Sequence, residues 1–303
     1  MTTQQIPQSI QTSQPTTELP YHRLAHANPR HRWWRPLITV VVTLVTWFVL
    51  SLLFGSAIGR LAGSSELMLT FTEENGMPSA NRPIGALLSF GSVALMLPAL
   101  VFGLWVGERR WIGTMSSVAG RLRRPELLRH LGLAVGVIVV IMGGSTVAGV
   151  LAGQLPVPSV TPWTLGLLLV ALLVVPIQAA AEEYVFRGLP QQMLGAWLKN
   201  PWFGILLPVP LFTIAHIYNP VGLISVGLFA VAAGVLTWRT RGLEAAIALH
   251  VMNNVYAVVL GAFAVSDLTA TEIPIIGLLT SSAVVVVFTG IVLVRSKRKA
   301  ATR

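Results

Sequence analysis

The chain has 303 residues, of which 54% are hydrophobic and only 11% are charged, and its mean hydropathy is +0.72. Soluble domains are far less apolar, so this composition indicates a protein whose solvent is the lipid bilayer. The net charge of +10 does not indicate nucleic-acid binding, because the basic residues fall between long apolar runs and are not gathered in one segment. The chain contains no cysteine, which excludes disulfides, thiol nucleophiles and thiolate metal sites.

The first thirty or so residues are rich in Gln, Thr, Ser and Pro and contain little apolar material. Such a segment cannot bury enough surface to fold alone, so we expect residues 1–32 to form a disordered cytoplasmic tail. The first apolar run begins near Leu37, far from the start of the chain, and is long enough to cross a membrane. We therefore expect a membrane anchor there and not a cleaved signal peptide.

Long apolar runs continue through the rest of the chain. A helix needs about 20 apolar residues to cross the hydrocarbon core of a bilayer. Runs of this kind lie at 37–58, 84–106, 131–151, 162–181, 202–217, 221–238, 243–265 and 273–294. The fifth run is short and contains Pro208 and Pro210. The sequence thus predicts an all-α polytopic membrane helical bundle of about eight transmembrane helices.

The basic residues predict the orientation of this bundle. With eight spans, alternate loops face opposite sides, and all of the 21 lysines and arginines except Arg60 and Arg82 fall on one side. Loops rich in Lys and Arg stay in the cytoplasm. We expect a multi-pass protein of the cell membrane with both termini cytoplasmic, divided into N-terminal transmembrane helices (33–160), a core (161–266) and a last helix with a basic cytoplasmic tail (267–303).

Two carboxylates and an arginine stand together at the end of the fourth apolar run, in the string EEYVFR. On a helix Glu183 and Arg187 are four residues apart and share a face, whereas Glu182 is rotated by about 100°. We expect Glu183 to be paired with the arginine and Glu182 to stay free for acid–base work. The alternative is that all three side chains only extend to the headgroups at a cytoplasmic helix end.

Two later spans carry histidines. Phe212 and His216 are four residues apart in the fifth span, and His250 and Asn254 are four apart in the seventh. An imidazole or a carboxamide that faced lipid would be costly, so we expect these side chains to point into the bundle and to meet there.

Three chemistries fit these polar residues. Glu182 could act as a base on water together with His216, a His-carboxylate set could hold a metal with an activated water, or the residues could relay protons in a transporter. The chain lacks an HExxH motif, so the zincin type of metalloprotease is excluded.

The strings Glu182-Glu183-x-x-x-Arg187, Phe212-x-x-x-His216 and His250-x-x-x-Asn254 resemble, in order, the EExxxR, FxxxH and HxxxN motifs of the CAAX-protease and bacteriocin-processing (CPBP, or Abi) membrane proteins, which include the type II CAAX prenyl endopeptidases. The resemblance covers about 162–265. It implies an intramembrane endopeptidase that cleaves a membrane-associated protein or peptide, CAAX-like or bacteriocin-like.

The resemblance also implies roles for the residues. Glu182 and His216 would activate water, His250 and Asn254 would stabilise the oxyanion, and Glu183, Arg187 and Phe212 would support the site. It leaves a divalent metal open, with zinc as the candidate and Glu182, His216 and His250 as the candidate ligands. The rival interpretations are a non-catalytic immunity or scaffold protein of the membrane and a proton-coupled transporter.

The depths of these residues raise a difficulty. Glu182 follows the end of the predicted fourth span, whereas His216 lies far along the fifth, which runs in the opposite direction. For the two to meet, we expect the fourth helix to continue past Glu182 towards Leu189 and the fifth to be shallow and bent at Pro208 and Pro210.

Overall fold

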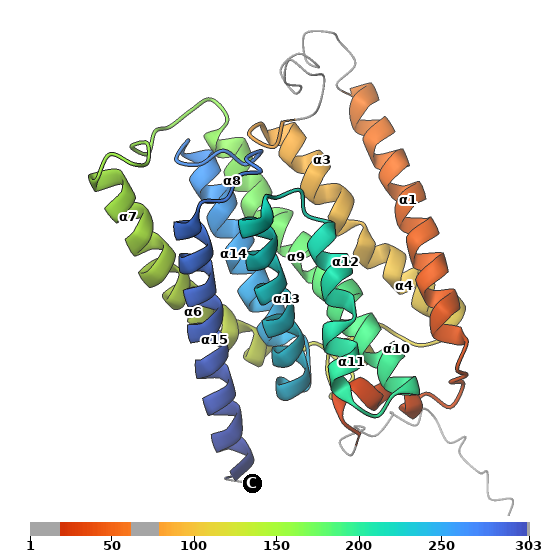
Figure 1. The fold of residues 1–303 in the computed structure, drawn as a ribbon. Coiled ribbons are helices and arrows are strands. Elements are labelled where there is room, and N and C mark those ends of the chain that lie inside the picture. The colour runs from red at the N-terminus through yellow and green to blue at the C-terminus, as the bar shows by residue number, and fades with distance from the viewer. Residues whose placement is uncertain (1–18, 62–78, 302–303) are drawn as a thin grey trace, which may run out of the picture.

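The structure, a computed structural model, describes residues 19–61 and 79–301 (Figure 1). Its described residues form helices and no strand. The α-helices are α1 (Arg35–Leu61), α3 (Pro83–Ala94), α4 (Met96–Gly107), α5 (Gly113–Ser116), α6 (Arg124–Ile138), α7 (Gly144–Leu151), α8 (Thr164–Leu173), α9 (Val175–Glu183), α10 (Leu189–Trp197), α11 (Pro201–Leu206), α12 (Pro208–Ile214), α13 (Pro220–Thr240), α14 (Glu244–Ala262) and α15 (Ile275–Ala301). A 3-10 helix, η1 (Tyr21–Ala27), precedes them, and two π-helical turns, η2 (Val139–Gly143) and η3 (Tyr184–Gly188), join α6 to α7 and α9 to α10.

The predicted membrane bundle is confirmed. Within the described residues, seven helical segments are long and apolar enough to cross a membrane, and an eighth, Pro201–Ile214, is apolar but shorter. That shorter segment is the predicted fifth run, and it breaks at Leu207, directly before Pro208. Figure 1 shows the segments running alternately up and down, with η1 and the C-terminus at the same end of the bundle.

The fourth span is much longer than its apolar run. It extends over 34 residues, Thr164–Trp197, whereas the hydropathy pattern ended at 181. The pattern stopped there because it counts Glu182, Glu183 and Arg187 as polar, but all three are buried inside the bundle. Glu182 therefore lies near the middle of a continuous helix, as the depth argument required.

Helix α14 forms the centre of the bundle. Half of the most apolar stretch of α14 is buried, compared with 11% of the corresponding stretch of α1 at the periphery. Its side chains enter three separate buried clusters, with Ile247 in the first, Leu249 in the second and Val258 in the third. Polar groups on α14 therefore face other helices and not lipid.

The expectation of a disordered tail is wrong for residues 21–27, and residues 1–18 lie outside the described part of the chain. Helix η1 packs against α10, with Tyr21, Leu24 and Ala25 almost fully buried. The approach is so close that a Cβ at Gly195 of α10 would clash with the carbonyl oxygen of His22. The sequence analysis did not predict this helix because its few apolar residues follow a segment of mostly polar composition.

Tyr21 should be the main anchor of η1. It is fully buried, its hydroxyl donates to the carbonyl oxygen of Met115, and burial raises the pKa of this phenol well above its usual value. We expect Tyr21→Ala to cost about 3–5 kcal/mol by leaving a cavity, and Tyr21→Phe about 1 kcal/mol by losing one hydrogen bond. Thermal unfolding of the purified protein in detergent measures both, with the exposed Trp111→Ala as control. Equal melting temperatures for Tyr21→Ala and this control would contradict the assignment.

Candidate active site

The predicted site residues come from α9 and η3, from α12 and the turn that follows it, and from α14. The π-helical turn η3 lies directly after the two glutamates, where the N–H of Leu189 donates to the carbonyl of Tyr184, five residues back. Pro190 follows in α10, and its ring would clash with the carbonyl four residues earlier in a regular α-helix. The wider turn relieves this clash, and such π-bulges often occur at functional sites.

The second glutamate, Glu183, is paired as predicted. Its Oε1 lies 3.0 Å from Nη1 of Arg187 on the next turn and 2.7 Å from Nδ1 of His250 on α14. All three side chains are buried, with exposed fractions of 5% or less. Because an ionised carboxylate only accepts hydrogen bonds, Nδ1 of His250 is the protonated nitrogen. The contact therefore sets the orientation of His250 and keeps a proton on Nδ1.

The first glutamate, Glu182, is not free, contrary to expectation. Its Oε2 accepts a hydrogen bond from Nε2 of Gln178 and lies 3.3 Å from Nε2 of His250. It nevertheless keeps 11% of its side chain accessible, whereas Glu183 keeps none. Of the two carboxylates, Glu182 is thus the one that a water or a substrate can reach.

Gln178 was missed by the sequence analysis. Its Oε1 accepts from Nδ2 of Asn254 at 3.1 Å while its Nε2 donates to Glu182, so it links α14 to the carboxylate. The available signal was its position: Gln178 is a lone amide in an apolar run, one helical turn before Glu182 and on the same face.

His216 follows the end of α12 and is half-buried. Its Nδ1 lies 2.8 Å from the carbonyl oxygen of Phe212, so Nδ1 is the donor and Nε2 is the unprotonated nitrogen of the neutral ring. The ring centre of Phe212 lies 4.8 Å from that of His216 and 6.2 Å from that of His250, so the two imidazoles flank one aromatic ring. The short, bent fifth segment therefore brings His216 to the depth of Glu182.

Tyr218 is a second residue that the sequence analysis missed. It lies in the loop two residues after His216, and its ring centre lies 6.0 Å from that of His216. Tyr218 is thus an aromatic neighbour of His216.

Aromatic rings surround the buried charges. The guanidinium of Arg187 lies 4.0 Å from the ring centre of Phe212, and His250 packs edge-on against Phe229 at 4.9 Å. Phe212 also contacts His216 at 4.8 Å. These rings exclude water from the Arg187 side of the site and leave access on the Glu182 side, which strengthens the electrostatic contacts inside.

A resident metal does not fit this arrangement of side chains. Among residues 19–61 and 79–301, no group of three or more His, Cys, Asp or Glu is placed to hold a metal ion. Both ring nitrogens of His250 already face carboxylates, so this imidazole has no nitrogen free for a metal. The zinc ligand set of Glu182, His216 and His250 stays a prediction, and no step below is routed through a metal.

The buried ion pair should be important for stability. Replacing Arg187 by Met leaves the Glu183 carboxylate buried without its cation, which we expect to cost about 3–5 kcal/mol. The double variant Glu183→Gln with Arg187→Met should recover part of this loss, because the buried charge is removed as well. The matched control is Arg129→Met, which breaks a pair whose arginine is 65% exposed, and such pairs contribute less than about 1 kcal/mol. The melting temperatures of the three variants in detergent are compared with that of wild type. An Arg187→Met variant that melts at the same temperature as wild type would refute the role of the pair.

Comparison with known proteins identifies the segment that contains all of these residues. Residues 161–256 match the family model described as type II CAAX prenyl endopeptidase Rce1-like. The uncharacterized protein YyaK of Bacillus subtilis (strain 168) is 36% identical over 97 residues, which are 30% of this chain and 32% of the relative, so the match spans about a third of that protein. No solved structure matches the chain. The resemblance predicted from the three motifs is confirmed over this segment.

Proposed function

Given an Rce1-like segment at 161–256, we propose that the protein is a membrane-embedded endopeptidase that cleaves a membrane-associated protein or peptide. The observation that carries this proposal is the line Glu182–His250–Glu183, two carboxylates on either side of one imidazole, buried in the middle of an apolar bundle. Ionisable groups are costly at this depth, and their convergence there is a mark of function.

Glu182 is the proposed general base. It is the accessible carboxylate of the pair, and it takes a proton from a water molecule whose oxygen attacks the scissile carbonyl carbon. His216 supports this step, because its unprotonated Nε2 can accept a hydrogen bond from the same water. The proton then passes from Glu182 to the leaving amine nitrogen, so that one water and one amide bond yield a carboxylic acid and an amine.

His250 and Asn254 are the proposed oxyanion donors. A proton shared between Nε2 of His250 and Glu182 stays on the imidazole when the negative charge moves to the substrate oxygen. Asn254 has two amide N–H groups, of which one donates to Gln178, so the other can reach the oxyanion. Glu183 and Gln178 act as positioning residues, because they hold His250, Asn254 and Glu182 without contacting the substrate.

Quenched-fluorescence peptides, some with a C-terminal lipid, test the proposal on purified protein in detergent. We expect wild type to cleave and Glu182→Gln and His250→Ala to lose at least about a hundredfold in kcat, as is usual for a lost general base or oxyanion donor. Glu272→Gln removes an exposed carboxylate outside the site and should cleave like wild type. Full activity in Glu182→Gln would refute the mechanism, and silence from folded wild type would favour an immunity protein or a transporter.

The same assay in the presence of a chelator tests whether cleavage depends on a metal. Because the site residues do not converge on a metal position, we expect cleavage to persist in chelator. Loss of cleavage in chelator and its return with zinc would overturn the metal-free route and would support Glu182, His216 and His250 as ligands.

We also infer that both ends of the chain face the cytoplasm. Figure 1 shows η1 and the C-terminus at one end of the bundle, and 19 of the 21 lysines and arginines were assigned to that side, all except Arg60 and Arg82. Because the chain has no cysteine, single-cysteine variants report the orientation directly. With a membrane-impermeant maleimide on intact cells, Ala270→Cys should react and Ala119→Cys should react only after permeabilisation. The opposite pattern would reverse the orientation.

A further inference from the structure

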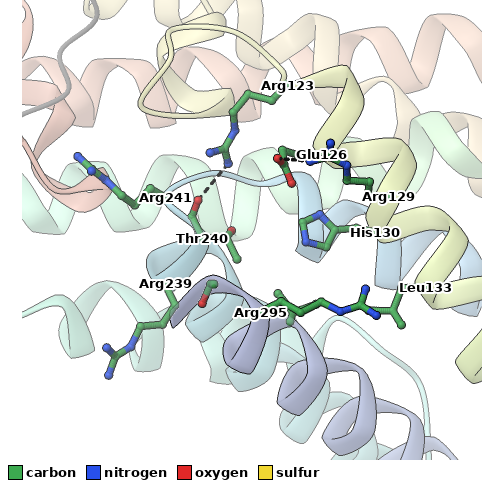
Figure 2. Close-up of a pocket in the computed structure, with 11 residues that line it drawn as sticks. Arg123, Glu126, Arg129, His130, Leu133, Arg239, Thr240, Arg241 and Arg295 are labelled. Carbon is green, nitrogen blue, oxygen red and sulfur yellow. Dashed lines mark hydrogen bonds and ion pairs between the residues drawn. The ribbon is translucent and has the colours of Figure 1, made fainter. Parts of the chain in front are cut away.

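A basic cleft, shown in Figure 2, is lined by residues none of which belongs to the site described above. It is formed by the first turns of α6, the end of α13 and the last described part of α15, and its volume is about 710 Å³. This volume falls in the range of small-molecule sites, roughly 300–1,000 Å³. The lining residues are Arg123, Glu126, Arg129, His130, Leu133, Arg239, Thr240, Arg241, Val292, Arg295 and Ser296.

Positive charge dominates this cleft. Five of its lining residues are arginines. In the described part of the chain, Glu126 pairs with Arg129 at 2.9 Å and the buried Glu244 pairs with Arg123 at 2.6 Å. Figure 2 shows Arg295 reaching from α15 across the cleft towards Leu133 of α6, whereas Arg239 and Arg241 point outward at the rim. Arginine presents a planar set of donors that suits phosphate oxygens.

The floor of the cleft is apolar and continues into the membrane. Val292 of α15 is buried there, and Leu133 lies on the α6 face that lines the cleft. One turn and two turns deeper on the same face, Gly136 and Val140 are exposed, with nothing within 4 Å of a Cβ built on the glycine. The cleft thus joins a cationic mouth to an exposed apolar strip, the pattern that fits an amphiphile.

We propose that this cleft binds an anionic glycerophospholipid of the adjacent leaflet. Arg129 and Arg295 hold the phosphate, and an acyl chain lies along Leu133 and Gly136 of α6 and Val140 of η2. Basic pockets between transmembrane helices commonly hold anionic headgroups. A free phosphate ester would use the cationic mouth alone, so the apolar strip is what selects the lipid. This site is independent of the proposed peptidase activity.

Native mass spectrometry of the full chain in detergent tests the proposal with three probes. These are phosphatidylglycerol, phosphatidylcholine with the same acyl chains, and soluble glycerol 3-phosphate. We expect wild type to retain phosphatidylglycerol in preference to the other two. The double variant Arg129→Gln with Arg295→Gln should bind it about tenfold more weakly, because two cations near the headgroup are lost.

The matched control replaces Arg121 and Arg124 by Gln, which removes two exposed arginines of the same region that do not line the cleft. This control should bind like wild type, and its thermal unfolding should match that of the double variant. If the double variant unfolds early, the single exposed variant Arg295→Gln replaces it. Equal retention of phosphatidylglycerol and phosphatidylcholine, or unchanged binding by the variants, would overturn the proposal. Glycerol 3-phosphate that competes as well as the lipid would assign the cleft to a soluble anion.

Discussion

A buried carboxylate in the middle of a membrane has to find partners, and the fold around Glu183 follows from that requirement. Without Arg187 and His250 its charge would be unpaired at zero exposure, at a cost of several kcal/mol. The two partners come from the next turn of its own helix and from α14, so satisfying one charge also ties the fourth span to the central helix. The other ring nitrogen of His250, Nε2, lies 3.3 Å from Oε2 of Glu182. The buried pair therefore also contacts the more accessible carboxylate.

Much of this arrangement could be predicted from the sequence, because the bilayer fixes the length of a spanning helix and the helical period fixes which residues share a face. Apolar runs located the spans, and the spacing of Glu183 and Arg187 indicated their pairing. The end of the fourth helix could not be found in this way, since a hydropathy window cannot tell a charge that is paired inside a bundle from one in water. Gln178 was missed for a related reason: its role depends on Asn254, which is 76 residues away in the chain and 3.1 Å away in space.

Helix α14 connects the two ends of the molecule. At its first residue, Glu244 holds Arg123 beside the basic cleft, and His250 and Asn254 follow on the same helix within the bundle. Because α14 is buried along much of its length, it cannot move at one end without disturbing the three clusters that it joins. Through the pair of Glu244 with Arg123, α14 thus contacts one lining residue of the cleft and also carries His250 of the candidate active site.

The 34 residues of the fourth span have a further consequence. At a rise of 1.5 Å per residue a straight helix of that length would measure about 50 Å, whereas the hydrocarbon core is about 30 Å thick. A helix so much longer than the hydrocarbon core has to tilt, bend or extend beyond the core. Pro176 and Pro190 stand on either side of the two glutamates and provide places to bend. The lipid composition around the protein, through its thickness, would therefore act on the same helix that carries Glu182.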